Sequence, residues 1–219
     1  VGQEHIIEPI KNAIRMGRVA HAYLFSGPRG IGKTTTARII AKSLNCTGEE
    51  KPCNRCASCD AFNAGASFNL IEIDAASNRG IDEIRELRNA VRFAPAQGTH
   101  KTYIIDECHM LTKEAFNALL KTLEEPPTHA VFILATTELE KVPATIVSRT
   151  QHFGFRRPTT QLMANRLCEI AEKEGAKLDH DASTIIAIAG EGSVRDAESI
   201  LGQITAVEDQ HITRDSVEM

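Results

Sequence analysis

Residues 22–34 read A-Y-L-F-S-G-P-R-G-I-G-K-T, an apolar segment that runs directly into a glycine-rich loop ending in Lys33 and Thr34. The segment predicts a buried strand, and residues 33 to about 45 predict a helix. The loop has the spacing G-x-x-x-x-G-K-[ST], in which backbone N–H groups surround a phosphate, the lysine reaches the β and γ phosphates and the hydroxyl binds Mg²⁺. A glycine-rich turn with a chance lysine is the alternative, but the position between a predicted strand and a predicted helix favours a phosphate loop. We therefore predict phosphate binding by Gly27, Pro28, Arg29, Gly30, Ile31, Gly32, Lys33, Thr34 and Thr35.

Short apolar segments alternate with helical patterns along the chain as far as residue 157. Residues 22–26, 70–74, 102–106 and 131–137 predict buried strands, and residues 151–155 a weaker fifth. Continuous apolar strands that alternate with helices are typical of a parallel sheet covered on both faces. We therefore predict an α/β fold of the P-loop NTPase class with a parallel five-stranded sheet.

Two carboxylates end the third predicted strand. Asp106 is placed to hold Mg²⁺, and Glu107 can accept a proton from an attacking water. Adjacent acidic residues also occur in solvated turns, but the carboxyl ends of parallel strands meet at the edge that carries the phosphate loop. Thr137 ends the fourth strand beside the expected γ phosphate, where its hydroxyl can hold the water. His109 completes a D-E-x-H pattern but receives no chemical role, because a single histidine is more often structural.

Four of the six cysteines lie within fourteen residues. Their spacing, C-x6-C-x2-C-x2-C, suits a closed tetrahedral Zn²⁺ site with a structural role. Free thiols in a loop or an iron–sulfur cluster are the alternatives, but residues 46–66 contain too few apolar side chains to fold unaided. Cys108 and Cys168 are predicted to be core residues. The predicted zinc ligands are Cys46, Cys53, Cys56 and Cys59.

From residue 158 three helical patterns follow one another without a strand signal. We predict two domains, a nucleotide-binding domain at 1–157 with the cysteine-rich insertion at about 46–66, and a small all-helical domain at 158–219. Arg195 opens the third helix, where a cation needs an anionic partner. A bound phosphate can supply it, and so can Asp196 or Glu198. Arg149 follows an apolar turn, as a surface cation or as an arginine finger for a neighbour's nucleotide.

The overall charge excludes nucleic-acid binding by bulk attraction. The 25 Lys and Arg residues and 29 Asp and Glu residues give a net charge of −4, and the chain has no Trp. Stacking platforms for single strands are therefore disfavoured as well. One helix carries arginines at i, i+3 and i+7, which form either a solvated face or a stripe that contacts the DNA backbone. The candidate DNA contacts are Arg79, Arg85, Arg88 and Arg92.

The sequence contains no pattern typical of membrane insertion or secretion. No run of eighteen apolar residues and no signal-peptide pattern occurs, and the cysteines have metal spacing rather than a disulfide pattern. We expect a reducing, cytoplasmic location.

Taken together, the motifs resemble a known family. V-G-Q-E-H at residue 1, the phosphate loop, the four-cysteine insertion, D-E-C-H-M-L-T at 106 and L-A-T-T at 134 belong to the resemblance, as do S-R-T at 148 and G-S-V-R-D-A at 192. They resemble the gamma/tau subunits of the bacterial DNA polymerase III clamp loader, which are AAA+ ATPases, over nearly the whole chain.

The resemblance implies both an activity and partners. ATP binding would let an assembly of this subunit with the delta and delta prime subunits and further gamma/tau copies open the sliding clamp. Primer-template DNA would then trigger hydrolysis to ADP and clamp release at the nucleoid-associated replication fork. Lys33, Thr34, Asp106 and Glu107 would form the Walker motifs. Thr137 would be sensor 1, Arg149 the finger that acts on a neighbour, and Arg195 sensor 2 in the helical lid.

The chain departs from the family pattern in four respects. Thr150 replaces the cysteine of the S-R-C motif, and the first gap in the cysteine cluster is short at six residues. A basic and aromatic stretch before V-G-Q and the C-terminal oligomerisation collar are absent. We therefore expect a fragment that is monomeric or weakly associating, with slow ATPase.

Two other classes of function remain open at this stage. A small-molecule P-loop kinase is disfavoured by Glu107, Thr137 and Arg195, and a phosphate-acceptor assay would decide. A scaffold subunit without hydrolysis is disfavoured by the intact Lys33, Thr34 and Glu107.

Overall fold

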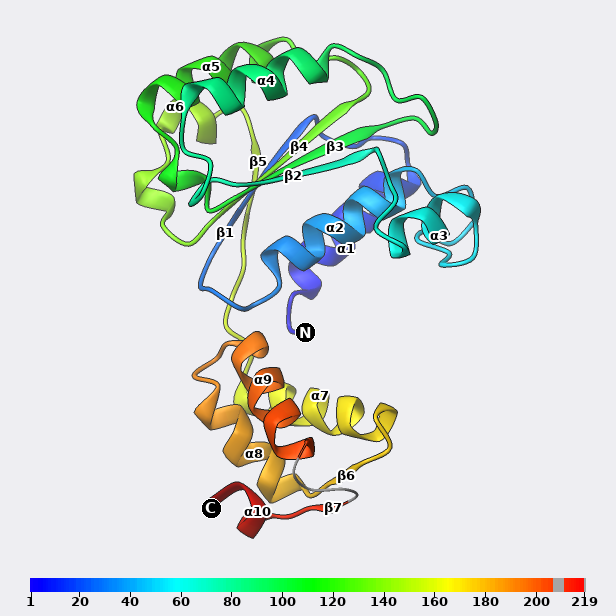
Figure 1. The fold of residues 1–219 in the computed structure, drawn as a ribbon, viewed down its shortest axis with the longest axis vertical. Helices are drawn as coiled ribbons and strands as arrows, with labels where there is room; N and C mark the ends of the chain where they lie inside the picture. Colours follow the sequence, from blue (N-terminus) through cyan, green and yellow to red (C-terminus); the bar gives the residue numbers. More distant parts are fainter. Residues whose placement is uncertain (207–210, 219) are drawn as a thin grey trace. The chain divides into compact units, whose positions relative to one another are not determined.

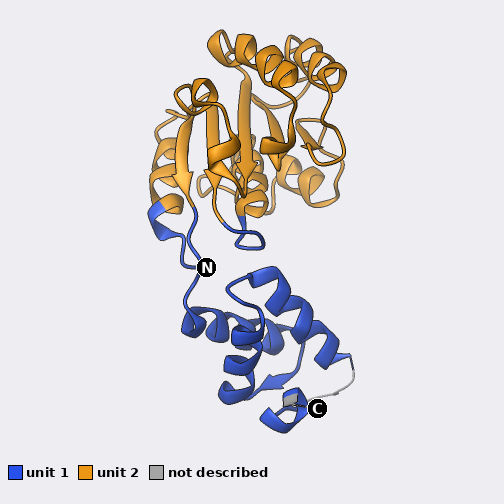
Figure 2. Cartoon of the chain, turned by 90° about the vertical axis from the view of Figure 1, so that its left-hand side faces the viewer, with its two compact units in different colours: residues 1–5, 28–32, 155–219 blue, residues 6–27, 33–154 orange. Residues whose placement is uncertain are grey.

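A computed structural model describes residues 1–206 and 211–218 of the chain (Figure 1). Residues 207–210 and 219, at the end of the predicted helical domain, lie outside the described residues. The chain forms two compact units, coloured separately in Figure 2. The sheet unit consists of residues 6–27 and 33–154, and the helical unit consists of residues 1–5, 28–32 and 155–219.

The sheet unit contains the predicted five-stranded parallel sheet, in the order β2-β3-β4-β1-β5. The strands are β1 (Ala22–Ser26), β2 (Leu70–Asp74), β3 (Lys101–Asp106), β4 (Ala130–Thr136) and β5 (Gln151–Gly154). Parallel pairing aligns their carboxyl ends: Ser26 pairs with Thr136, and Asp74 pairs with Asp106. The predicted fold class is confirmed.

Burial differs across the sheet. Every residue of the central strands β1 and β4 is buried, as the apolar runs predict. The prediction that β2 is buried is wrong, because its side chains are half-buried or exposed. As an edge strand, β2 pairs only with β3, which explains why Glu72 is accommodated there in an ion pair with Arg38.

Helices cover both faces of the sheet (Figure 1). On one face α4 (Ile81–Val91) and α5 (Lys113–Glu124) pack their apolar residues, such as Leu87 and Leu119, against Tyr103 and Phe132. The Thr112 hydroxyl accepts a hydrogen bond from the Ala115 N–H and so caps the start of α5, because it satisfies one of the free donors of the first turn. On the other face lie α1 (Glu4–Arg15) and α2 (Lys33–Leu44).

Short elements complete the sheet unit, and two of them lie near the carboxyl ends of the strands. They are α3 (Ala57–Asn63) in the cysteine-rich insertion, η1 (Cys108–Met110) after β3, η2 (Leu139–Lys141) after β4, and α6 (Ala144–Val147).

The helical unit has its own core, formed by residues such as Met163, Leu167, Ile186 and Leu201. Its helices are α7 (Thr160–Lys173), α8 (His180–Ala189), α9 (Val194–Thr205) and α10 (Arg214–Glu218). The prediction of a helical domain is confirmed, but the unit also has the short parallel pair β6 (Lys177–Leu178) and β7 (His211–Ile212). Two-residue strands carry no periodicity, so the sequence has no signal for them.

Among the described residues, no helix combines the length and the apolar content that crossing a membrane requires.

Candidate active site and metal centre

The glycine-rich loop joins β1 to α2, and its backbone requires glycine. Gly27, Gly30 and Gly32 have φ values of 139°, 74° and 97°, which side-chain-bearing residues rarely adopt. The first residue of α2 is Lys33, so the free N–H groups of the first helical turn follow the loop directly. Such an N-terminus attracts anions.

Within the sheet unit, Thr34 and Asp106 lie in direct contact. The Thr34 hydroxyl donates to Asp106 Oδ2 at 2.6 Å, although the two residues are 72 positions apart. The buried Lys33 donates from Nζ to the Gly27 carbonyl at 2.8 Å. The two predicted magnesium ligands, Thr34 and Asp106, therefore contact each other, and Thr34 directly follows Lys33 in the chain.

Glu107 adopts a left-handed backbone conformation, with φ 47° and ψ 43°. Its N–H donates to Asp106 Oδ1 at 2.9 Å, and its Oε2 accepts from the Thr137 hydroxyl at 2.9 Å. Left-handed conformations are costly for residues other than glycine and cluster at functional sites. The structure thus joins two residues that the sequence analysis assigned to one water molecule.

His109, to which the sequence assigned no chemical role, also lies at this edge. Its side chain is 6% exposed and lies between Glu107 and Glu138, with ring nitrogens 3.5 Å and 3.0 Å from the two carboxylates. The D-E-x-H spacing was the available signal, but spacing alone does not show that the ring turns back toward Glu107.

Within the helical unit, the start of α9 lies against loop residues 28–32. The Arg195 N–H donates to the Gly30 carbonyl at 3.2 Å. A Cβ atom added at Gly30 would lie 1.9 Å from Ser193 Oγ, so this contact needs glycine. The Arg195 side chain is exposed. The structure therefore brings the backbone of Arg195 to the predicted phosphate loop.

Arg149 has partners within its own chain. One guanidinium nitrogen donates to the Thr145 carbonyl at 2.8 Å, and the other lies 2.8 Å from Glu124 Oε1. Both side chains of the ion pair are partly exposed, so the pair contributes little to stability. The sequence analysis did not foresee Glu124 as a partner.

The four cysteines of the insertion converge. Their Sγ atoms all lie within 4.8 Å of one another, as ligands of one metal ion would. Backbone N–H groups of Gly48 and Cys53 donate to Cys46 Sγ at 3.4 and 3.2 Å. Such donors stabilise a thiolate ligand. The four-cysteine cluster is consistent with zinc.

The environments of the cysteine thiols differ. A hydrogen bond from the Thr47 backbone lowers the pKa of Cys56 to about 5, with further help from Cys59. Burial raises the pKa of Cys59 to about 12. A divalent cation would let all four sulfurs be thiolates at once.

The insertion is attached to the sheet unit by polar side chains. Asn45 donates from its amide to the His100 carbonyl at 2.8 Å, and its Oδ1 accepts from the Thr99 and His100 N–H groups. Lys42 of α2 donates to the Asn54 and Asn63 side chains. The loop is therefore held at both of its ends.

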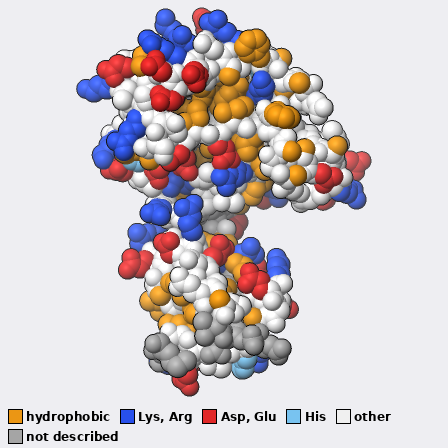
Figure 3. Space-filling model, in the orientation of Figure 1, with side chains coloured by type: hydrophobic (Ala, Val, Ile, Leu, Met, Phe, Trp, Pro, Cys, Tyr) orange, Lys and Arg blue, Asp and Glu red, His pale blue; other side chains and the backbone are white. Residues whose placement is uncertain are grey.

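The predicted arginine stripe on α4 is not uniformly exposed. Arg85 and Arg92 are exposed, whereas Arg88 is half-buried with its Nε enclosed and without a hydrogen-bond partner. Arg85 pairs with Asp82 at 3.1 Å, and Arg79 donates from Nε to the Ala76 carbonyl. Figure 3 shows acidic side chains among the basic ones over α4 and α5, so this face is of mixed charge.

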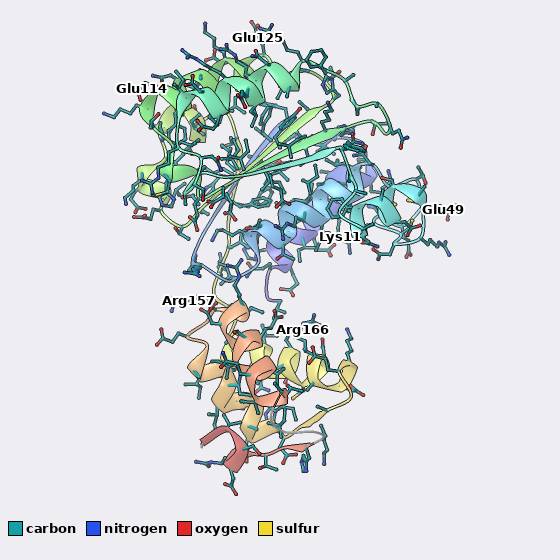
Figure 4. All side chains as sticks on the ribbon, in the orientation of Figure 1. Lys11, Glu49, Glu114, Glu125, Arg157 and Arg166 are labelled. Carbon is teal, nitrogen blue, oxygen red and sulfur yellow. The ribbon has the colours of Figure 1, made fainter. Side chains whose placement is uncertain are left out.

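A groove of about 670 Å³ lies between α1, α2 and residues 49–52 of the insertion. Figure 4 labels two residues that line it, Lys11 of α1 and Glu49 of the insertion. Lys33, Thr34, Asp106 and Glu107 do not line this groove. It is therefore separate from the candidate active site.

Comparisons with known sequences assign the chain to a family. Residues 2–159 match the family described as DNA polymerase III, delta subunit, and residues 162–209 match the DNA polymerase III clamp loader subunit, ATPase lid domain. The chain is 53% identical over 205 residues to DNA polymerase III subunit tau of Bacillus subtilis, covering 93% of this chain and 36% of the relative. It is 45% identical over 219 residues to subunit tau of Escherichia coli, covering 99% of this chain and 34% of the relative. The chain thus spans about a third of the length of these relatives.

Solved structures show the same fold. The Thermotoga maritima RuvB Holliday junction branch migration motor matches with a TM-score of 0.74 at 20% identity, covering 100% of this chain and 68% of that chain. A DNA polymerase III gamma subunit-related protein from Thermotoga maritima matches with a TM-score of 0.52 at 22% identity, covering 91% and 62%. At these identities the likeness concerns the fold alone.

Proposed function

Because the chain belongs to the gamma/tau family of DNA polymerase III clamp-loader subunits, we propose that it binds ATP with Mg²⁺ and hydrolyses it. The observation that carries the proposal is the pairing of Thr34 with Asp106 and of Thr137 with Glu107 at the carboxyl edge of the sheet. Each pair joins the residues that handle the metal and the attacking water in P-loop ATPases.

The residues divide the chemistry among them. Loop N–H groups and Lys33 bind the β and γ phosphates, and the oxygens of Thr34 and Asp106 fit Mg²⁺, which prefers hard oxygen ligands. Mg²⁺ would supply charge neutralisation on the phosphates. Glu107 accepts a proton from water that Thr137 helps to orient, and ADP and phosphate are the products.

The proposed domain roles follow the division into 1–157 and 158–219. The first part provides the phosphate loop, Asp106 and Glu107, and the second acts as a lid in which Arg195 senses the nucleotide. Its backbone hydrogen bond to Gly30 supports this role. Arg149 would serve the nucleotide of a neighbouring subunit, which requires it to leave Glu124.

In the cell we propose that the subunit works in a clamp loader with delta, delta prime and further gamma/tau copies. ATP binding and hydrolysis would load the sliding clamp onto primer-template DNA at the replication fork. Arg79, Arg85, Arg88 and Arg92 remain candidate DNA contacts, with the exposed Arg85 and Arg92 better placed than Arg88.

We propose that Cys46, Cys53, Cys56 and Cys59 bind one structural Zn²⁺. Four sulfurs within 4.8 Å of one another fit a closed tetrahedral site, where zinc–sulfur distances are about 2.3 Å. With four protein ligands no position is open for water, so the ion would take no part in hydrolysis.

Steady-state ATP turnover and nucleotide affinity test the ATPase proposal, measured on the full-length protein in its clamp-loader complex. Lys33→Ala should abolish nucleotide binding. Glu107→Gln should keep binding and lower kcat by about 100-fold or more, since it removes the general base. Lys113→Ala, at an exposed position of α5, is the matched control. The proposal would be refuted if the Lys33→Ala variant and the Glu107→Gln variant each hydrolysed ATP as fast as the wild type.

A further inference from the structure

The buried imidazole of His109 lies at the strand edge, and the proposed hydrolysis has not used it. It lies in η1, three residues after Asp106, and its side chain is only 6% exposed. A buried titratable ring within reach of two carboxylates requires a physical account, because polar groups are buried at a cost unless they are paired.

Both ring nitrogens of His109 have specific partners. Nδ1 lies 3.0 Å from Thr136 Oγ1 and 3.5 Å from Glu107 Oε2, and Nε2 lies 3.0 Å from Glu138 Oε1. Glu138 in turn pairs with Lys141 at 2.7 Å. The ring therefore connects the end of β4 and the loop that follows it to Glu107.

The contact with Glu138 determines how the ring is oriented. The hydrogen bond from Lys141 lowers the pKa of Glu138, so its carboxylate is ionised and can only accept. Nε2 of His109 is consequently the donor in that contact. With Nε2 directed at Glu138, the Nδ1 edge faces the Thr136 hydroxyl at 3.0 Å and packs against Glu107 Oε2 at 3.5 Å, a contact that is longer than a hydrogen bond.

Glu107 needs such support because, among the described residues, few other side chains contact its carboxylate. The side chain starts from a left-handed backbone, and its Oε2 contacts the Thr137 hydroxyl and His109 Nδ1. Thr137 has a second task in the proposed mechanism, namely to orient water. A general base must be held within hydrogen-bond reach of the proton that it accepts.

We propose that His109 is a positioning residue for Glu107: held by Glu138 and Thr136, its imidazole sets the direction of the Glu107 carboxylate. The inference rests on the proposed ATPase function and deepens it. It implies that the D-E-x-H pattern is one device, in which the histidine acts through the glutamate and does not touch the nucleotide.

Two amide substitutions separate the two edges of the ring. In His109→Asn the amide lies where Nδ1 was and can still reach Thr136 and Glu107. In His109→Gln the amide lies where Nε2 was and can reach only Glu138. If His109 only filled space, the two substitutions would lower kcat by similar factors, because the position of the amide group would not matter.

The experiment measures kcat and nucleotide Kd for the full-length protein in its complex. His109→Ala should lower kcat by about tenfold or more, because misplacement of a catalytic group by about 1 Å costs up to roughly 100-fold, and Kd should change by less than about twofold. His109→Asn should recover most of kcat, and His109→Gln should not. His129→Ala is the matched control: it removes a half-buried imidazole that is hydrogen-bonded to the Val91 carbonyl and lies just before β4.

Unchanged kcat in His109→Ala, or equal losses in the Asn and Gln variants, would overturn the inference while leaving the ATPase proposal intact. If ATP turnover is the same in the wild type and in Lys33→Ala, the ATPase proposal fails instead. A crystal structure of His109→Ala decides the inference even then. The Glu107 carboxylate should turn away from its 2.9 Å contact with Thr137, and an unmoved carboxylate would contradict it.

Discussion

The strand edge and the cysteine-rich insertion are both polar sites of the sheet unit, but they are held together differently. At the edge, Asp106 and Thr136 end strands whose preceding residues are almost completely buried. In the insertion, most residues are exposed or half-buried, and Cys59 is the buried residue of α3. Apolar burial supports the first site, whereas convergence of four sulfurs supports the second.

The difference shows which interactions stabilise each site in the folded protein. Burial of β1 and β4 side chains stabilises the edge at roughly 25 cal/mol per Å² of apolar surface, with or without a ligand. The insertion buries little apolar surface, so metal coordination must offset the entropy of ordering its loop. We therefore expect the two sites to respond independently to changes that remove one or the other.

The largest effect should follow from loss of a predicted zinc ligand. Cys59→Ser should reduce bound zinc from about one per chain to almost none, because structural zinc contributes folding energy of the order of 10 kcal/mol in small sites. Metal analysis with hydrogen exchange checks this: amides of 46–66 should lose protection while those of β1 and β4 keep theirs.

Cys168→Ser is the control for this experiment, since it alters a half-buried cysteine of the helical unit outside the cluster. Retention of zinc by Cys59→Ser, or simultaneous loss of protection in β4, would show that the two sites are not independent.

An intermediate effect on zinc binding should follow from adding one methyl group at Gly48. A Cβ atom at Gly48 would lie 2.5 Å from Cys53 Cβ and 3.0 Å from its Sγ. Gly48→Ala should therefore displace Cys53 and weaken zinc affinity by about 10- to 100-fold, as other changes around metal ligands do. Competition with a zinc chelator measures the affinity.

Gly202→Ala is the matched control with the opposite sign. Among the described residues, no atom beyond its chain neighbours and its own helix backbone lies within 4 Å of a Cβ placed there, and the residue is an exposed position inside α9. It should raise stability by about 0.5–1 kcal/mol in denaturant unfolding and leave zinc affinity unchanged. Equal zinc affinities for the two variants and the wild type would remove the claim about Gly48.

The last test needs no substitution: after mild chelation of the metal, it compares the alkylation rates of cysteine thiols at the strand edge and in the insertion. Cys108 is fully buried at the strand edge, and burial raises its pKa to about 12, so its thiol is protonated at pH 8. Cys56, with its pKa of about 5, is fully ionised there. Mass spectrometry should find Cys56 alkylated at least about 1,000-fold faster, since Cys108 reacts only through unfolding. Similar rates would show that the edge opens as readily as the insertion.

The sequence predicted the sheet well because its central strands are continuous apolar runs with turn residues on both sides. It also placed Asp106, Glu107 and Thr137 near the phosphate loop, since carboxyl ends of parallel strands share one edge. It misjudged β2, because apolar content does not reveal which strand lies at the margin of the sheet. Arg88 was predicted as part of a stripe by its spacing, yet its Nε is enclosed.

What the sequence determined by itself is local: strands, helix starts, the glycine loop and the spacing of four cysteines, all of which depend on neighbours within a few residues. Only the tertiary structure decided long-range pairs such as Arg149 with Glu124 and His109 with Glu138. The physical reason is that side-chain direction depends on backbone conformation and packing. The left-handed turn at Glu107 and the burial of His109 are set by the whole sheet and its covering elements.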